Sequence, residues 1–237
     1  MRNPILVALD VDNLPEALKL VEQLREHVRG FKVGLELCMH IGLQTAIAAI
    51  SAAGGELFVD LKFKDIPNTV AGAVRAVARP GVYMFNVHCD GGSAMLRAAA
   101  EVAHAAPSRP LALGVTVLTS IDETALHDEL RIPGPMNDYV LHLAKLAQGA
   151  GMDGVVCSAH EVSAIKAACG PNFVAVVPGV RPAWAEANDQ KRTMTPAEAM
   201  KAGANFLVLG RPITRPPANI GTPADAARRI MDEIANG

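Results

Sequence analysis

Charged residues interrupt an apolar segment of the chain and indicate acid–base chemistry there. Residues 57–65 read LFVDLKFKD, with Asp60 and Lys62 two positions apart and Asp65 just beyond. Side chains two apart on a strand point to the same face, so a carboxylate and an ammonium would meet at one site. An ion pair that only adds stability is a poor explanation, because desolvation offsets much of the attraction. We therefore predict that Asp60, Lys62 and Asp65 are catalytic.

A second lysine extends this charged group. Lys32 lies in the preceding apolar run, FKVGLEL, so Lys32, Asp60, Lys62 and Asp65 would alternate in sign within one network. Each carboxylate then holds its neighbouring lysines protonated, which suits a lysine that donates a proton to a basic carbon. A lysine that forms a Schiff base must instead be neutral to attack. The pattern predicts a catalytic acid.

A phosphate site is predicted separately near the end of the chain. Residues 206–214 read FLVLGRPIT, where Gly210 allows close backbone approach and Arg211 supplies a bidentate guanidinium. The segment 178–196, PGVRPAWAEANDQKRTMTP, is too polar for the core and is predicted to be a mobile lid. Arg181 and Gln190 are its expected ligand contacts.

The elements that must position these residues are short apolar runs separated by stretches with helical spacing. Eight runs are predicted to be strands: residues 5–10, 31–37, 57–63, 84–89, 111–118, 154–159, 173–179 and 206–210. Seven helical stretches are predicted between and after them: residues 14–28, 45–54, 68–78, 94–106, 139–151, 196–204 and 223–235. Strand and helix alternate throughout.

This alternation at 237 residues predicts one domain over residues 1–237, an α/β protein with a single (β/α)8 TIM barrel. An open doubly wound sheet would favour a Gly-rich turn after the first strand, but LDVDNLPE carries Asp10 and Asp12 there. The segment 131–138, RIPGPMND, is predicted to be a surface connection after the fifth strand. In such barrels the chemistry lies on the loops that follow the strands.

Composition limits the classes of partner. With 22 basic and 24 acidic residues the chain has no strongly cationic character, so nucleic acid is not an expected partner. The first apolar run is broken by Asp10 and Asp12, so we expect neither a signal sequence nor a membrane span. The four cysteines are widely spaced and predicted to be reduced and buried, which favours a cytoplasmic location.

Several motifs together resemble the orotidine 5′-monophosphate decarboxylase family over nearly the whole chain. They are LVALD at Asp10, FKVG at Lys32, the D-x-K-x-x-D of Asp60, Lys62 and Asp65 followed by IPNT, VLTS at Thr119, VPGVRP at Arg181, DQKRTMTP at Gln190 and LGRPIT at Arg211. The D-x-K-x-x-D pattern also occurs in a related family of sugar-phosphate lyases. The complete set, in this order, is specific to the decarboxylases.

The resemblance implies a role for each matching residue. Lys62 would protonate C6 of the pyrimidine of orotidine 5′-monophosphate (OMP) as CO₂ leaves to give UMP, while Asp60 lies against the departing carboxylate. The other implied contacts are Lys32 and Asp10 with the ribose, Thr119 with the pyrimidine, Arg181, Gln190, Gly210 and Arg211 with the phosphate, and Asp65, Ile66 and Thr69 with the site of a second subunit. A homodimer with shared active sites, and no metal or organic cofactor, are therefore expected.

Two other functions remain open from the sequence. A Mg²⁺-dependent sugar-phosphate decarboxylase or aldolase of the related family would need a carboxylate where Lys32 stands, because a lysine opposes a cation. The seven histidines show no metal-binding spacing, and His88 is expected to be a histidine of the core or of the barrel mouth. A non-catalytic phosphate-binding barrel is the other alternative; it would hold nucleotide without consuming it.

Overall fold

The computed structural model describes residues 3–185 and 194–237, and its strands close into a barrel. Every strand is parallel to its neighbours, and β8 pairs with β1 to complete the ring. The strands are β1 Ile5–Ala8, β2 Gly30–Val33, β3 Leu57–Phe63, β4 Val82–His88, β5 Leu111–Val115, β6 Gly154–Val156, β7 Val174–Pro178 and β8 Phe206–Leu209. The (β/α)8 barrel predicted from the sequence is confirmed.

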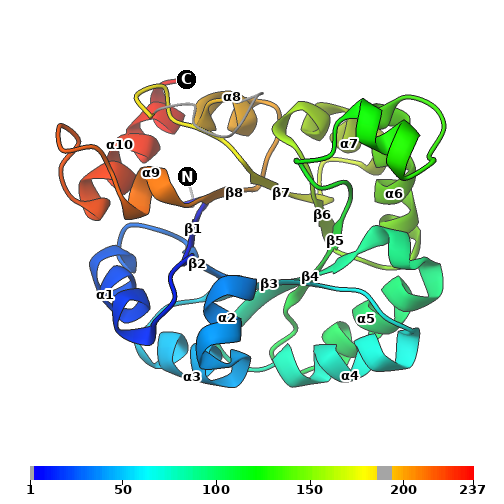
Figure 1. The fold of residues 1–237 in the computed structure, drawn as a ribbon, viewed down its shortest axis with the longest axis horizontal. Helices are drawn as coiled ribbons and strands as arrows, with labels where there is room; N and C mark the ends of the chain where they lie inside the picture. Colours follow the sequence, from blue (N-terminus) through cyan, green and yellow to red (C-terminus); the bar gives the residue numbers. More distant parts are fainter. Residues whose placement is uncertain (1–2, 186–193) are drawn as a thin grey trace.

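Helices surround the barrel, as Figure 1 shows in a view in which the strands ring the centre. They are α1 Leu14–Leu24, α2 Leu35–Ile41, α3 Leu43–Ala52, α4 Pro67–Val77, α5 Ser93–Ala105, α6 Met136–Gly149, α7 Val162–Cys169, α8 Pro196–Lys201, α9 Arg211–Thr214 and α10 Pro223–Asn236. Single turns form η1 Cys89–Gly91, η2 Ala125–Glu129 and η3 Ala159–Glu161. We call the end at which strands run into these helices the mouth, and the opposite end the floor.

Caps and apolar spacing agree in the first and the last of the outer helices. In α1 the Asn13 side chain accepts a hydrogen bond from the backbone N–H of Glu16, and Ala17, Leu20, Val21 and Leu24 are buried at helical spacing. Helix α10 begins with the same device: Thr222 and Asp225 form a capping box. These caps set the starts of α1 and α10, so the apolar face of each of the two helices meets the barrel.

Two apolar layers hold the barrel. The larger core lies between strands and helices and includes most of the buried residues of the helices. A smaller cluster fills the inside of the barrel and consists of Leu6, Phe58, Met84, Leu113, Val115, Val156 and Val176. Because side chains alternate along a strand, these residues identify which positions of each strand point inward.

The prediction for the second strand is wrong in its second half. The run 31–37 was expected to be extended, but β2 ends at Val33 and α2 begins at Leu35. In α2 the adjacent Leu37 and Cys38 are buried while Leu35 and Met39 are exposed, a helical arrangement with no strand alternation. Helices α7 and α9 were also not predicted, and the end of segment 131–138 already belongs to α6.

In the part of the chain that the structure describes, no single helix has the length and apolar character of a membrane span. Helices α2 and α3 reach that length only when they are taken together, and they are bent by 100° at the break between them. Both helices bury apolar residues in the outer core, among them Leu37 and Ile47.

Candidate active site

The inside of the barrel changes from apolar to charged toward the mouth. Phe58 points inward, so Asp60, two residues further along β3, lies on the same face one layer higher. Lys32 of β2 is the register partner of Phe58, and therefore also faces inward. The strand pleat thus brings the charged residues that the sequence singled out to the mouth.

The charged side chains form a continuous chain of contacts. Lys62 Nζ donates to Asp60 Oδ1 at 2.7 Å, and the other oxygen of Asp60 lies 3.7 Å from Lys32 Nζ. Lys32 Nζ also donates to Asp10 Oδ1 at 2.8 Å. Asp10, Lys32, Asp60 and Lys62 thus alternate in sign across β1, β2 and β3, and we call them the charged network.

Burial of the charged network is graded. The side chains of Lys32 and Asp60 are 11% and 14% exposed, that of Lys62 is 30% exposed and that of Asp10 is 51% exposed. Charge–charge interactions are strongest away from water, so the Lys32–Asp60 contact forms the inner part of the network. Lys62 and Asp10 keep surface free for a ligand at the mouth.

Lys62 itself has an unusual backbone, and a residue that sequence reasoning missed supports it. Its φ angle is +52°, a left-handed conformation that costs a non-glycine residue about 1–3 kcal/mol. The Asn86 side chain on β4 accepts the Lys62 backbone N–H at 2.8 Å and donates to Asp60 Oδ1 at 2.7 Å. Asn86 is fully buried. The available signal was an amide inside the apolar run MFNVHC, in inward phase with Met84.

Gly34 was also missed and makes room for Lys32. It follows β2 directly, and a Cβ built on it would lie 3.0 Å from Lys32 Nζ. The same Cβ would lie 3.9 Å from Asp10 Oδ1. A glycine immediately after a strand that carries an inward charge was the only signal in the sequence. Its missing side chain leaves the Lys32–Asp10 hydrogen bond undisturbed.

Asp65 does not join the charged network within one chain. Its Oδ1 accepts the backbone N–H of Ile66 at 2.6 Å, and Asp65, Ile66 and Thr69 are all exposed where β3 runs into α4. Ile66 keeps 67% of its surface exposed, a large value for an apolar residue. These three residues therefore face outward beside the mouth.

The predicted phosphate residues lie at the mouth ends of β7 and β8. Gly210 and Arg211 follow β8 directly, where α9 begins. Arg181 lies beyond the end of β7, and its backbone N–H donates a hydrogen bond to the carbonyl oxygen of Met194. A Cβ on Gly210 would lie 3.9 Å from Asp10 Oδ2, so this side adjoins the charged network through β1. Thr119 is exposed after β5. Gln190 falls outside the described residues, as do all of residues 186–193 of the predicted lid.

Two further ionisable groups line the mouth ends of β4 and β6. Burial lowers the pKa of His88, against the opposing effect of Asp90, so His88 is neutral at pH 7. Burial raises the pKa of Glu161 to about 7, although the backbone N–H of Ser158 donates to its carboxylate at 2.9 Å. Among residues 3–185 and 194–237, no three His, Cys, Asp or Glu side chains are placed to hold a metal ion.

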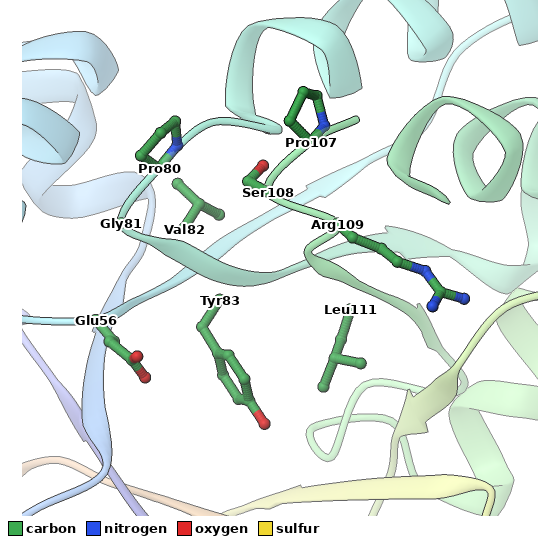
Figure 2. A pocket seen from close by; sticks show the side chains of 9 residues that line it. All are labelled: Glu56, Pro80, Gly81, Val82, Tyr83, Pro107, Ser108, Arg109 and Leu111. Carbon is green, nitrogen blue, oxygen red and sulfur yellow. The ribbon is translucent and has the colours of Figure 1, made fainter. Parts of the chain in front are cut away.

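A cavity of about 480 Å³ lies at the floor of the barrel, remote from the charged network along the strands. Glu56, Tyr83, Arg109 and Leu111 line it (Figure 2). They lie at the starts of β3, β4 and β5, the end of such barrels that contributes to stability rather than to chemistry. Volume alone therefore does not locate the active site here.

Comparison with known proteins gives concordant results. The family model "Orotidine 5'-phosphate decarboxylase / HUMPS family" matches residues 3–230. A protein of Heliobacterium modesticaldum named orotidine 5'-phosphate decarboxylase is 48% identical, over 100% of this chain and 97% of its own. A relative of the same name from Moorella thermoacetica is 50% identical, over 98% and 92%. The crystal structure of orotidine 5'-phosphate decarboxylase from Lactobacillus acidophilus superimposes with a TM-score of 0.84 at 37% identity, covering 98% of this chain and 99% of that one.

Proposed function

The chain belongs to the orotidine 5'-phosphate decarboxylase / HUMPS family, and we propose that it converts OMP to UMP and CO₂ in pyrimidine biosynthesis. The observation that carries this assignment is the charged network, in which Lys62 is held at 2.7 Å by Asp60. The close relatives that share the decarboxylase name support it over the whole length of the chain.

The proposed reaction uses the side chains of the network directly. The substrate carboxylate would lie beside Asp60, whose like charge disfavours the bound carboxylate and is relieved as CO₂ departs. The bond from C6 to the carboxylate breaks, its electron pair stays on C6, and Lys62 gives its proton to that carbon. A fixed ammonium close to C6 lowers the energy of the carbanion, and solvent then reprotonates the amine.

The remaining residues would bind the nucleotide. Lys32 and Asp10, joined at 2.8 Å, would contact the ribose hydroxyls, and Thr119 would face the pyrimidine. Gly210, Arg211, Arg181 and Gln190 would hold the phosphate. The proximity of Gly210 to Asp10 supports placing the phosphate and the ribose side by side.

The metal-dependent alternative fits these residues less well. A Mg²⁺ ion takes oxygen ligands, and it would have to share Asp10 and Asp60 with the ammonium of Lys32, which contacts both. Two like charges at one pair of carboxylates repel each other. The residues present therefore favour decarboxylation without a metal.

A homodimer with shared active sites is part of the proposal. Exposed apolar side chains follow both β2 and β3 at the mouth: Leu35 is 59% exposed, Met39 is 80% exposed and Ile66 is 67% exposed. Exposed apolar surface of this kind marks interaction sites. Asp65 and Thr69 lie beside Ile66, and would enter the site of the partner subunit to complete the alternation of charge.

A cytoplasmic location is proposed as well. The four cysteines, Cys38, Cys89, Cys157 and Cys169, are all free and buried. Burial raises the pKa of each thiol, for Cys89 to about 12, so these thiols are unreactive structural residues. Buried free thiols are compatible with a reducing compartment.

The activity is tested with purified protein and OMP in EDTA, following the ultraviolet absorbance of the orotate ring. We expect the band to disappear as UMP forms. A stable band would refute the decarboxylase assignment; keto-sugar phosphates with Mg²⁺ would then test the related lyase activity. Retention of bound nucleotide without turnover would instead support the non-catalytic alternative.

Mixing two inactive variants tests the shared site. Asp65→Asn and Lys62→Ala proteins, dissociated and reassembled together, would form hybrid dimers in which one site carries both changes and the other carries neither. Recovered activity is expected in the mixture and in neither variant alone. A mixture as inactive as its components, with hybrid formation verified by native mass spectrometry, would exclude the shared site.

A further inference from the structure

Asn86 joins the two catalytic side chains from a neighbouring strand, although it lies outside the motifs of the sequence. Its carboxamide oxygen accepts the backbone N–H of Lys62, and its nitrogen donates to Asp60 Oδ1. The residue has no exposed surface. A fully buried amide is normally retained only where its hydrogen bonds are satisfied, as they are here.

The pairing of β3 with β4 explains why a side chain is needed at this place. Val59 is the partner of Phe85 and Phe63 is the partner of Val87, so three residues of β3 face Asn86 alone. Such a bulge removes regular ladder partners and redirects side chains next to active sites. Asn86 occupies the interruption, and its oxygen provides an acceptor for the N–H of Lys62 within the bulge.

The bulge also contains the left-handed residue. Lys62 has φ +52°, and strained conformations of this kind persist where the surroundings hold them. The hydrogen bond that the backbone N–H of Lys62 donates to Asn86 anchors the backbone at this point. The hydrogen bond that Asn86 donates to Asp60 orients the carboxylate that pairs with the Lys62 ammonium. Both ends of the Lys62–Asp60 pair thus depend on one carboxamide.

We propose that Asn86 is a positioning residue for the decarboxylation, holding the Lys62 ammonium and the Asp60 carboxylate in register through the β3 bulge. The inference rests on the proposed function. A carboxamide is specifically suited to the task, because it offers one acceptor and one donor in a fixed geometry. An aspartate would keep the acceptor for Lys62 N–H but would place a second carboxylate against Asp60.

The test compares wild type, Asn86→Ala and Asn86→Asp in OMP turnover, UMP binding and thermal unfolding. We expect kcat to fall about a hundredfold in Asn86→Ala, as expected for misplaced reacting groups, and further in Asn86→Asp. KM and the Kd for UMP should stay within about threefold, because the hydrogen bonds of the Asn86 side chain go to Lys62 and Asp60 and not to the proposed ligands of the phosphate and the ribose. The matched control is Asn205→Ala, which removes an amide whose oxygen accepts a hydrogen bond from the backbone N–H of Ala175 at the floor. It should lower the melting temperature without changing kcat.

Each result bears on the proposal. If the amide were purely structural, the isosteric change Asn86→Asp would do less harm than Asn86→Ala. An Asp variant more active than the Ala variant would therefore overturn the proposed positioning role of Asn86. Unchanged kcat in Asn86→Ala would do the same, as would failure of both variants to fold. If only one variant folds, its kcat relative to wild type is the test. A fall of about a hundredfold or more supports the positioning role of Asn86, and an unchanged kcat overturns it. Wild type inactive toward OMP would instead refute the proposed function itself.

Discussion

Lysines are held at both ends of the barrel, but by different partners. At the mouth, Lys62 Nζ donates to the Asp60 carboxylate at 2.7 Å. At the floor, Lys166 Nζ donates to the carbonyl oxygens of Pro171 and Phe173 at 3.0 and 2.6 Å, and to the amide oxygen of Asn205 at 2.7 Å. One ammonium is therefore paired with a charge and the other with neutral dipoles.

The difference shows what separates a chemical site from a structural one. Burial lowers the pKa of Lys166, and its three oxygens come from segments that precede β7 and β8, so this lysine ties chain segments together. The ammonium of Lys62 contacts the carboxylate of Asp60, two residues away on the same strand, and its side chain stays 30% exposed at the mouth. A charge held by charges, with one side left for a ligand, can act on a substrate.

Removal of the mouth lysine is expected to have the largest effect. In Lys62→Ala the proposed proton donor to C6 is lost, so kcat/KM for OMP should fall more than about a hundredfold, or about 2.7 kcal/mol in the activation barrier. Thermal unfolding should remain cooperative. The control Lys64→Ala removes an exposed lysine that lies two residues beyond Lys62 and pairs with Asp90, and should retain turnover. Comparable losses in both variants would contradict a specific role for Lys62.

Arg211→Ala tests whether the mouth also uses binding energy far from the chemistry. Loss of the proposed charge-assisted contact with the phosphate should raise KM by about tenfold or more, and should also slow turnover of bound substrate. The control Arg215→Ala changes an exposed arginine one turn further on. Steady-state kinetics at saturating OMP separates the two effects. An unchanged limiting rate in Arg211→Ala would contradict the proposed coupling between phosphate binding and catalysis.

At the floor, the opposite pattern is expected. Lys166→Met leaves two carbonyl groups without their donor, so unfolding free energy should fall by about 2–3 kcal/mol while kcat and KM for OMP stay unchanged. At this chain length that corresponds to a melting temperature lower by about 4–12 °C. Lys201→Met, an exposed lysine in the last turn of α8, is the control. A change in kcat for Lys166→Met would contradict a purely structural role for the lysine at the floor.

The smallest effect concerns Glu161, a mouth-side charge outside the network. Its pKa is raised to about 7 by burial, so the unfolded chain releases this proton first as pH rises. Stability linked to the protonated carboxyl is complete below about pH 4.5 and is lost as pH rises to about 7. Glu161→Gln should therefore be more stable than wild type at pH 8 by about 1–2 kcal/mol, and equal to it at pH 4.5. Denaturant unfolding at both pH values checks this; a pH-independent difference would contradict the shift.

Much of the fold followed from the sequence because its signals are local. Eight apolar runs alternate with helical spacing, and each run overlaps an observed strand. The run 31–37 misled because the large apolar residues of FKVGLEL stand at every second position, as in a strand. The change to helix after Gly34 is set by which side chains the barrel can bury. Short helices such as α9, with four residues, carry too few positions to show a period.

The sequence by itself determined the charges, their order along the chain and the strand phase that brings Asp60 and Lys32 to the inside of the barrel. Only the tertiary structure decided that Asn86 bridges Asp60 and Lys62, because this depends on a register shift between two strands. It also decided that Asp65 lies outside the network of its own chain. Residue types and pleat are local properties, whereas strand register and the approach of side chains from different strands arise only when the barrel closes.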